Sequence, residues 1–274
     1  MAAVGPRALA TPAPEAVAPL LPAQRRIWLL QRLFPNGTAH AVPIVIRLDG
    51  RLDVAALQRA LDALAARHPA LRTTFAEHNG TPVQLVWPEC GVRLERPRLR
   101  QKRTGHDEVG AQAALRILLD AAIRAPFDLA EGPLLRAQLI KRAPRSHVLA
   151  LIVHGIVCDD DSRRTLGREL VLLYRAFTSG RPDSLPPPPV TPQAIAAARA
   201  AEAGNGARAA DLAWWRATLA GVETLQLLPD RAAPPLPSQR AERHPADLPP
   251  DLVAPLLALA AAEDATPLAV VLAL

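Results

Sequence analysis

Apolar positions recur every three to four residues in two early segments, Pro22–Leu33 and Asp53–Ala66, and this spacing predicts two amphipathic helices. A proline suits the first turn of the first helix, and an aspartate can cap the second. Between them, Val42–Leu48 is rich in β-branched residues and ends at the turn-forming pair Asp49-Gly50, so it predicts a strand. The chain therefore opens as helix, strand, helix.

The middle of the chain alternates strand and helix signals. Thr73–Val86 holds Asn79-Gly80, two residues that accept positive φ, between two β-rich runs, and this predicts a hairpin. Leu134–Arg142 and His147–Val153 predict two more strands, and the second is apolar on both faces, which is typical of an inner strand. We expect helices at Asp107–Arg124 and Ser162–Phe177, and a basic, solvated loop at Gly91–Thr104.

The C-terminal third is punctuated by prolines. Residues 179–192 include four consecutive prolines and predict a linker. Helices are expected at Asp211–Leu219 and Asp251–Glu263. Leu268–Leu274 is entirely apolar and has no capping residue. So short an apolar helix is not stable alone, and we expect either a continuation after it or a partner that covers it.

Charge and cysteine content narrow the class of protein. The net charge is +6, but the basic residues are almost all arginines spread along the chain, whereas nucleic-acid binding needs a clustered stripe, so we expect no nucleic-acid partner. Cys90 and Cys158 are too few for a disulfide scaffold, which favours a cytoplasmic protein. Residues 1–19 lack the apolar core of a signal peptide and predict a disordered leader. No apolar stretch is long enough to predict a membrane span.

Three segments stand in the order and context of known motifs: Leu21–Trp28, Arg67–Phe75 and Val153–Asp160. They resemble the first three core motifs of the condensation domains of nonribosomal peptide synthetases. Further segments that share the resemblance, which runs over about residues 20–274, are Arg47–Asp53, Pro126–Leu129, Gly132–Arg136, Trp214-Trp215 and Leu228–Arg231.

The resemblance implies an α/β fold of the chloramphenicol-acetyltransferase-like kind, in which a central mixed sheet is flanked by helices. That family has two lobes with a tunnel between them, and this chain resembles the N-terminal lobe. The domains implied are a disordered leader at 1–19, the N-terminal lobe at 20–178, the linker at 179–192, and a crossing segment with the start of a truncated second lobe at 193–274.

The third motif of the family reads His-His-x-x-x-Asp-Gly, and its second histidine is the residue at the reacting centre. Here that position is Gly155, which has no side chain for proton transfer. His154 matches the first histidine, for which the resemblance implies mainly a packing role. Asp159 matches the motif aspartate, for which it implies an ion pair with an arginine of the second motif, Arg72 before Arg67. A buried carboxylate needs such a partner.

Asp160 replaces the motif glycine and Asp161 follows it. These acids can simply cap a helix and favour its dipole, or Asp160 can narrow the space that the family leaves for a pantetheine arm. Adjacent residues on a tight loop point apart, so we expect no metal site on Asp159–Asp161. Cys158 has no nearby base other than His154 that could activate it as a nucleophile, so we expect a small buried thiol.

Three functions remain open at this point. The chain can be part of a condensation domain that forms amide bonds between carrier-bound aminoacyl thioesters, impaired or inactive because of Gly155. It can be a noncatalytic recruitment module of the same fold, since aspartate replaces the motif glycine in some such domains. It can also be a truncated sequence without a stable product. The resemblance implies no directly bound cofactor, phosphopantetheine arms on partner carrier proteins, other synthetase domains as partners, and in one alternative a separate chain that supplies the second lobe.

Overall fold

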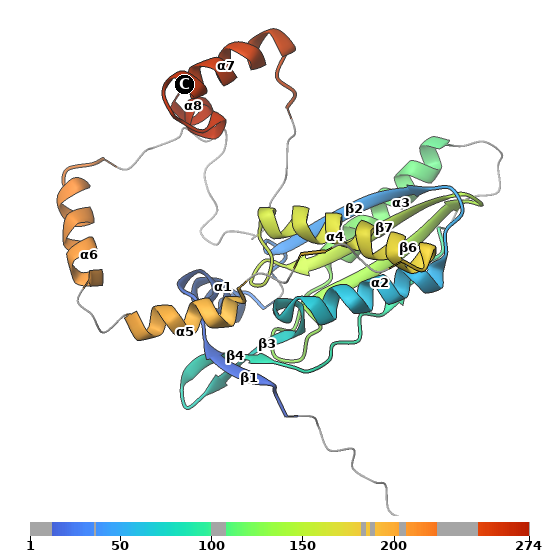
Figure 1. The fold of residues 1–274 in the computed structure, drawn as a ribbon, viewed down its shortest axis with the longest axis horizontal. Coiled ribbons are helices and arrows are strands. Elements are labelled where there is room, and N and C mark those ends of the chain that lie inside the picture. Colours follow the sequence, from blue (N-terminus) through green and yellow to red (C-terminus); the bar gives the residue numbers. More distant parts are fainter. Residues whose placement is uncertain are drawn as a thin grey trace, which may run out of the picture. The chain divides into compact units, whose positions relative to one another are not determined.

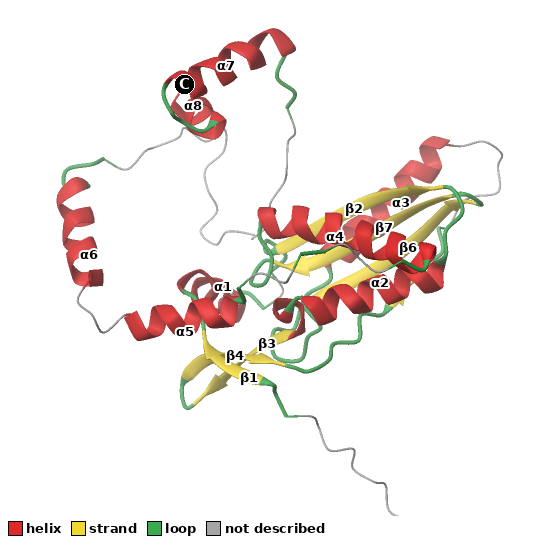
Figure 2. Cartoon of the chain, viewed as in Figure 1, coloured by secondary structure: helices red, strands yellow, loops and turns green. Residues whose placement is uncertain are grey.

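The computed structural model describes residues 13–35, 37–99, 108–181, 185–186, 190–202, 207–223 and 246–273 of the chain. The chain divides into two compact units, Met1–Arg240 and Ala241–Leu274. The predicted domain boundary at 179–192 stays a prediction. The first unit combines sheets and helices (Figure 1, Figure 2), which confirms the α/β class.

The larger sheet has four strands in the order β2 (Ala41–Asp49), β7 (Ser146–His154), β6 (Leu135–Ala143) and β5 (Leu94–Glu95). β7 pairs antiparallel with both β2 and β6, whereas β5 pairs parallel with β6, so the sheet is mixed, as predicted. The predicted inner position of the strand before His154 is confirmed. Almost every residue of β7 is buried, which explains why its sequence is apolar on both faces.

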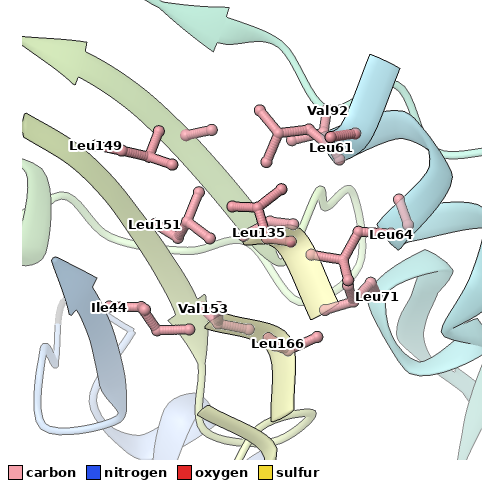
Figure 3. Packing of buried hydrophobic residues seen from close by; sticks show 14 of the residues in the cluster. Ile44, Leu61, Leu64, Leu71, Val92, Leu135, Leu149, Leu151, Val153 and Leu166 are labelled. Atoms are coloured by element: carbon pink, nitrogen blue, oxygen red, sulfur yellow. The ribbon is translucent and has the colours of Figure 1, made fainter. Parts of the chain in front are cut away.

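Helices cover both faces of this sheet. Leu149, Leu151 and Val153 of β7 pack with leucines of two helices on one face (Figure 3), whereas Ala150 and Ile152 belong to a second cluster on the opposite face. Each fully buried aliphatic side chain contributes about 1.5–3 kcal/mol to folding. The helices are α2 (Val54–Arg67) and α4 (Asp160–Ser179) on the first face and α3 (Glu108–Arg124) on the second; all three were predicted.

The smaller sheet has the order β1 (Ala16–Pro19), β4 (Thr81–Val86) and β3 (Thr73–His78). The predicted hairpin is present, and Asn79 and Gly80 have φ values of 51° and 75°. The prediction of a disordered leader up to residue 19 is wrong for 16–19, which form β1. This strand has four residues, of which one is a proline, and its partner β4 is far away in sequence, so no local periodicity reveals it.

The remaining elements include three helices and a 3₁₀ turn. The predicted first helix is α1 (Pro22–Leu33), and a 3₁₀ turn, η1 (Pro69–Arg72), leads into β3. α5 (Pro192–Glu202) contacts β1 and was not predicted, because it is rich in alanine and has no stripe of large apolar residues. α6 (Ala207–Thr218) matches the predicted helix around 211–219. β5 interrupts the loop predicted at 91–104, of which residues 100–104 lie outside the described residues.

The second unit consists of α7 (Pro250–Ala262) and α8 (Pro267–Ala273), both at positions predicted as helical. Residue 274 of the predicted apolar run lies outside the described residues. Among the described residues, no single helix has the length and apolar character of a membrane span. Only α7 and α8 taken together have that length and apolar character, and the pair is bent by 104°. Several of their leucines are exposed: Leu252, Leu257, Leu268 and Leu272.

Candidate functional site

The candidate site is the motif loop, residues 155–159, which joins β7 to α4. The sheet holds the start of this loop: His154 N donates to Leu134 O at 3.0 Å, and Gly155 N donates to His40 O at 2.6 Å. The other end of the loop is fixed by Asp159, which is the N-cap of α4. The loop therefore lies at the C-terminal end of the inner strand, where the sequence placed it.

The ring of His154 belongs to the core. The residue is 2% exposed, its ring lies edge-to-face with Phe127 at 5.5 Å between centroids, and its Nδ1 accepts a hydrogen bond from Ile156 N at 3.2 Å. Burial, followed by the positive charges of His40 and Arg136, lowers the pKa of His154 to about 4. The imidazole is therefore neutral at pH 7 and is held by packing.

Gly155 lies against the backbone of the neighbouring strand. A Cβ atom at this position would be 3.1 Å from His40 O and 3.7 Å from His40 Cβ. The φ angle of Gly155 lies outside the left-handed region, so a side chain is compatible with the backbone. The backbone of His40, however, would have to move away by a few tenths of an ångström. Gly155 therefore allows a close approach of the motif loop to the residue that precedes β2.

The predicted ion pair of Asp159 with Arg72 or Arg67 does not form. Asp159 is exposed, and its Oδ1 accepts hydrogen bonds from Ser162 N at 2.8 Å and from Ser162 Oγ at 2.6 Å. These bonds, with the hydroxyl first, lower the pKa of the Asp159 carboxyl below its usual value. The prediction assumed a buried carboxylate. At the surface, with the helix terminus as donor, Asp159 needs no arginine.

Arg72 instead stabilises the smaller sheet. It is 9% exposed, and its Nη1 donates to Glu15 Oε2 at 2.9 Å, to Pro88 O at 3.2 Å and to Trp87 O. Its Nε is buried without a partner in the described residues. The second-motif arginine therefore links the residue before β1 to the chain that follows β4.

Arg67 joins a buried charge cluster that sequence reasoning missed. Arg67 Nε lies 3.0 Å and His68 Nε2 lies 2.6 Å from the same oxygen, Oε2 of Glu169, which is 3% exposed. Arg67 Nη2 also donates to Pro186 O. A signal was present in the sequence, because Glu169 falls among the buried leucines on the apolar stripe of α4.

The two acids after Asp159 lie in the first turn of α4. Asp160 Oδ1 is 3.4 Å from Arg163 Nη2, and Asp161 pairs with Arg164. Both carboxylates are exposed and stand at the end of the helix where its dipole favours negative charge. The cap itself is Asp159, so the two following acids act on the helix through their charge.

Cys158 is 4% exposed. Burial, followed by the neighbouring carboxylates, raises the pKa of its thiol to about 12, so the side chain stays protonated at neutral pH. The structure thus places a buried, unreactive thiol in the loop. Within the described part of the chain, no group of three His, Cys, Asp or Glu side chains comes together in a way that could hold a metal ion.

Three buried glutamines, which the sequence analysis did not single out, form a hydrogen-bond network that reaches the motif loop. Gln24 Nε2 donates to Ile156 O at 3.3 Å and to Gln84 Oε1 at 3.4 Å. Gln193 Nε2 donates to Thr73 Oγ1 at 3.0 Å and to Gln84 Oε1 at 3.3 Å. The glutamines are at most 8% exposed. This glutamine network connects α1, the smaller sheet and α5 to the motif loop.

Comparison with known proteins agrees with this arrangement. The profile of the family described as Condensation domain matches residues 14–274, so the chain belongs to the condensation-domain family. It is 38% identical to chondramide synthase cmdD from Chondromyces crocatus over 232 residues, which is 84% of this chain and 6% of that protein. The resemblance inferred from the three motifs is confirmed.

Solved structures share the fold. The starter condensation domain of rhizomide synthetase RzmA matches with a TM-score of 0.67 at 22% identity, over 76% of this chain and 49% of that chain. The X-domain from teicoplanin biosynthesis, solved in complex with OxyB, also matches with a TM-score of 0.67, at 34% identity over 87% of this chain and 51% of that chain. The protein thus spans about half the length of these solved chains.

Proposed function

We propose that this chain acts as an N-terminal condensation lobe in nonribosomal peptide synthesis, on acyl and aminoacyl thioesters held by carrier proteins, and that amide formation at its own motif loop is impaired. Membership of the condensation-domain family supports the first part. Gly155 carries the second part, because the resemblance puts the reacting imidazole at that position. The expected partners are carrier proteins with their phosphopantetheine arms and other synthetase domains.

The chemistry explains the impairment. The amine nitrogen attacks the thioester carbonyl and must lose a proton, and a positioned base speeds such a step by about 10²- to 10⁴-fold. His154 is a poor substitute, because its ring is buried and its Nδ1 already accepts a hydrogen bond. Asp159 is a weak base, because Ser162 holds its carboxyl pKa low. The five residues of the motif loop therefore include no free base.

An amide-forming assay tests this proposal. An acetyl-loaded donor carrier and a glycyl-loaded acceptor carrier are mixed with the chain, and acetylglycyl thioester is followed by mass spectrometry. We expect Gly155→His to form product about 10²-fold or more faster than the unchanged chain. Gly155→Ala is the matched control, since it brings the same Cβ close to His40 O without an imidazole. Equal rates for all three proteins, or no product with Gly155→His, would contradict the proposal.

A recruitment module is the second candidate. It is supported by the 34% identity to the X-domain that was solved with OxyB. Asp160, in place of the motif glycine, fits the same alternative. In this case the chain and OxyB should elute together in gel filtration, and Gly155→His should remain without turnover. Separate elution of the two proteins counts against recruitment of this kind of partner.

A further inference from the structure

A second imidazole stands directly across from the position where the motif histidine is missing. The register between β2 and β7 pairs Ala41 with His154, and its continuation sets His40 opposite Gly155. Gly155 N donates to His40 O at 2.6 Å, and a Cβ at Gly155 would lie 3.7 Å from His40 Cβ. Opposite residues of antiparallel strands have neighbouring side chains. Side chains at the two positions therefore start from neighbouring Cβ atoms, 3.7 Å apart.

His40 differs from His154 in access and in hydrogen bonding. The rings are 6.0 Å apart between centroids, but His154 is 2% exposed whereas His40 is only half-buried. No described residue forms a hydrogen bond with a ring nitrogen of His40, whereas His154 Nδ1 is used by Ile156 N. The ring nitrogens of His40 therefore have no hydrogen-bond partner among the described residues, and they belong to a side chain that is only partly buried.

The charge environment keeps His40 suited to accept a proton. Burial, followed by the positive charge of Arg26 on α1, lowers the pKa of His40 below 6.5. Among the described residues, His154 on β7 also faces His40, at 6.0 Å between ring centroids, and it is neutral at pH 7 because its own pKa is about 4. At neutral pH His40 is therefore an uncharged imidazole.

We propose that His40 is the proton acceptor of this site, so that the residual amide formation of the chain depends on an imidazole supplied by the residue before β2 instead of by the motif loop. This inference rests on the proposed function. The amine nitrogen forms a bond to the thioester carbonyl carbon, and the carbon–sulfur bond breaks. A ring nitrogen of His40 takes the amine proton and passes it to the departing thiolate, so His40 ends unchanged.

The test uses the same carriers and the full chain. We expect the unchanged chain to exceed the uncatalysed rate at least tenfold, His40→Ala to lose that excess, and added imidazole to restore part of it in His40→Ala. His78→Ala is the matched control, since His78 is exposed at the end of β3, and it should keep the rate of the parent. Near-equal thermal unfolding of the variants verifies that His40→Ala is folded.

The pH dependence adds a readout that a structural role would not change. The rate of the unchanged chain, divided by the uncatalysed rate at the same pH so that ionisation of the glycyl amine cancels, should rise with pH through the pKa of His40, which lies below 6.5, and then level off. That pKa is measured independently by NMR titration of the histidine Cε1 protons. His40→Ala should lose this step.

The outcomes separate the inference from the proposed function. A parent chain at the uncatalysed rate beside an active Gly155→His overturns the role of His40 and leaves the proposed function in place. A His40→Ala variant as fast as the parent also overturns it. If Gly155→His and the parent both lack turnover, the proposed function and the inference fall together.

Discussion

Two carboxylates on α4 meet their need for hydrogen-bond donors in opposite ways. Asp159 is exposed at the start of the helix, where Ser162 supplies both donors. Glu169, ten residues later, is 3% exposed and takes its donors from Arg67 and His68 on α2 and the turn after it. A helix terminus has free N–H groups of its own, whereas the middle of a helix has none. A buried acid within a helix must therefore obtain its partners from another element.

The largest expected effect is at Glu169. Glu169→Ala leaves Arg67 and His68, each with about 15% side-chain exposure, without their carboxylate, and removal of one member of a buried pair costs about 3–5 kcal/mol. Urea denaturation measures the loss. The matched control is Glu77→Ala, which breaks an exposed pair with Arg32 and should cost less than about 1 kcal/mol. Similar midpoints for the two variants would show that the buried cluster adds no stability.

The next largest effect is the pH dependence due to His154. Its pKa is about 4 in the folded protein against 6.5 in the ordinary case, so the unfolded chain binds the proton more tightly. The corresponding stability, about 3 kcal/mol, is complete above pH 6.5 and is lost as the pH falls towards 4. His154→Gln should remove this part of the pH dependence in denaturant titrations, and His78→Gln should not. A parent whose stability is flat between pH 6.5 and 4 would refute the assignment.

The smallest effect is at Asp159. Asp159→Ala removes an N-cap and should cost about 1 kcal/mol, while Asp159→Ser should keep most of the stability, because serine also caps. Thermal unfolding compares the two variants with the parent. A loss of more than about 3 kcal/mol in Asp159→Ala would instead indicate the buried ion pair that the sequence predicted. Asp161→Ala, at an exposed residue of the same turn, serves as the control.

Regular elements with their own periodicity could be predicted from the sequence. The inner strand β7, the hairpin at Asn79-Gly80 and the helix capped by Asp53 all have local signals, and all are present. β1 and α5 were missed. Both are positioned by contacts with strands far away in sequence. β1 pairs with the backbone of β4, and α5 is joined to β3 by the buried side chain of Gln193. Such contacts leave no periodic pattern within a short segment.

The site was predictable in position but not in its contacts. The motif segment identified the loop with His154 and Gly155, and the structure places it at the end of β7. The role of His40 depends on strand register, which a sequence does not state when the paired residues are more than 100 positions apart. The partner of Asp159 was predicted wrongly, because the motif does not show whether its carboxylate is buried.

The burial of Gln193 has a consequence for chimeric synthetases built by exchange of domain halves. A junction within the proline-rich stretch 179–192 would bring a foreign residue to position 193, against Thr73 and Gln84. A side chain there that cannot donate would remove the hydrogen bonds to Thr73 Oγ1 and Gln84 Oε1, at about 0.5–1.5 kcal/mol each, although Gln24 would still donate to Gln84 Oε1. The proline-rich stretch separates two parts of the sequence, but a junction there separates Gln193 from Thr73 and Gln84. A junction between α5 and α6 keeps all three residues in the same half.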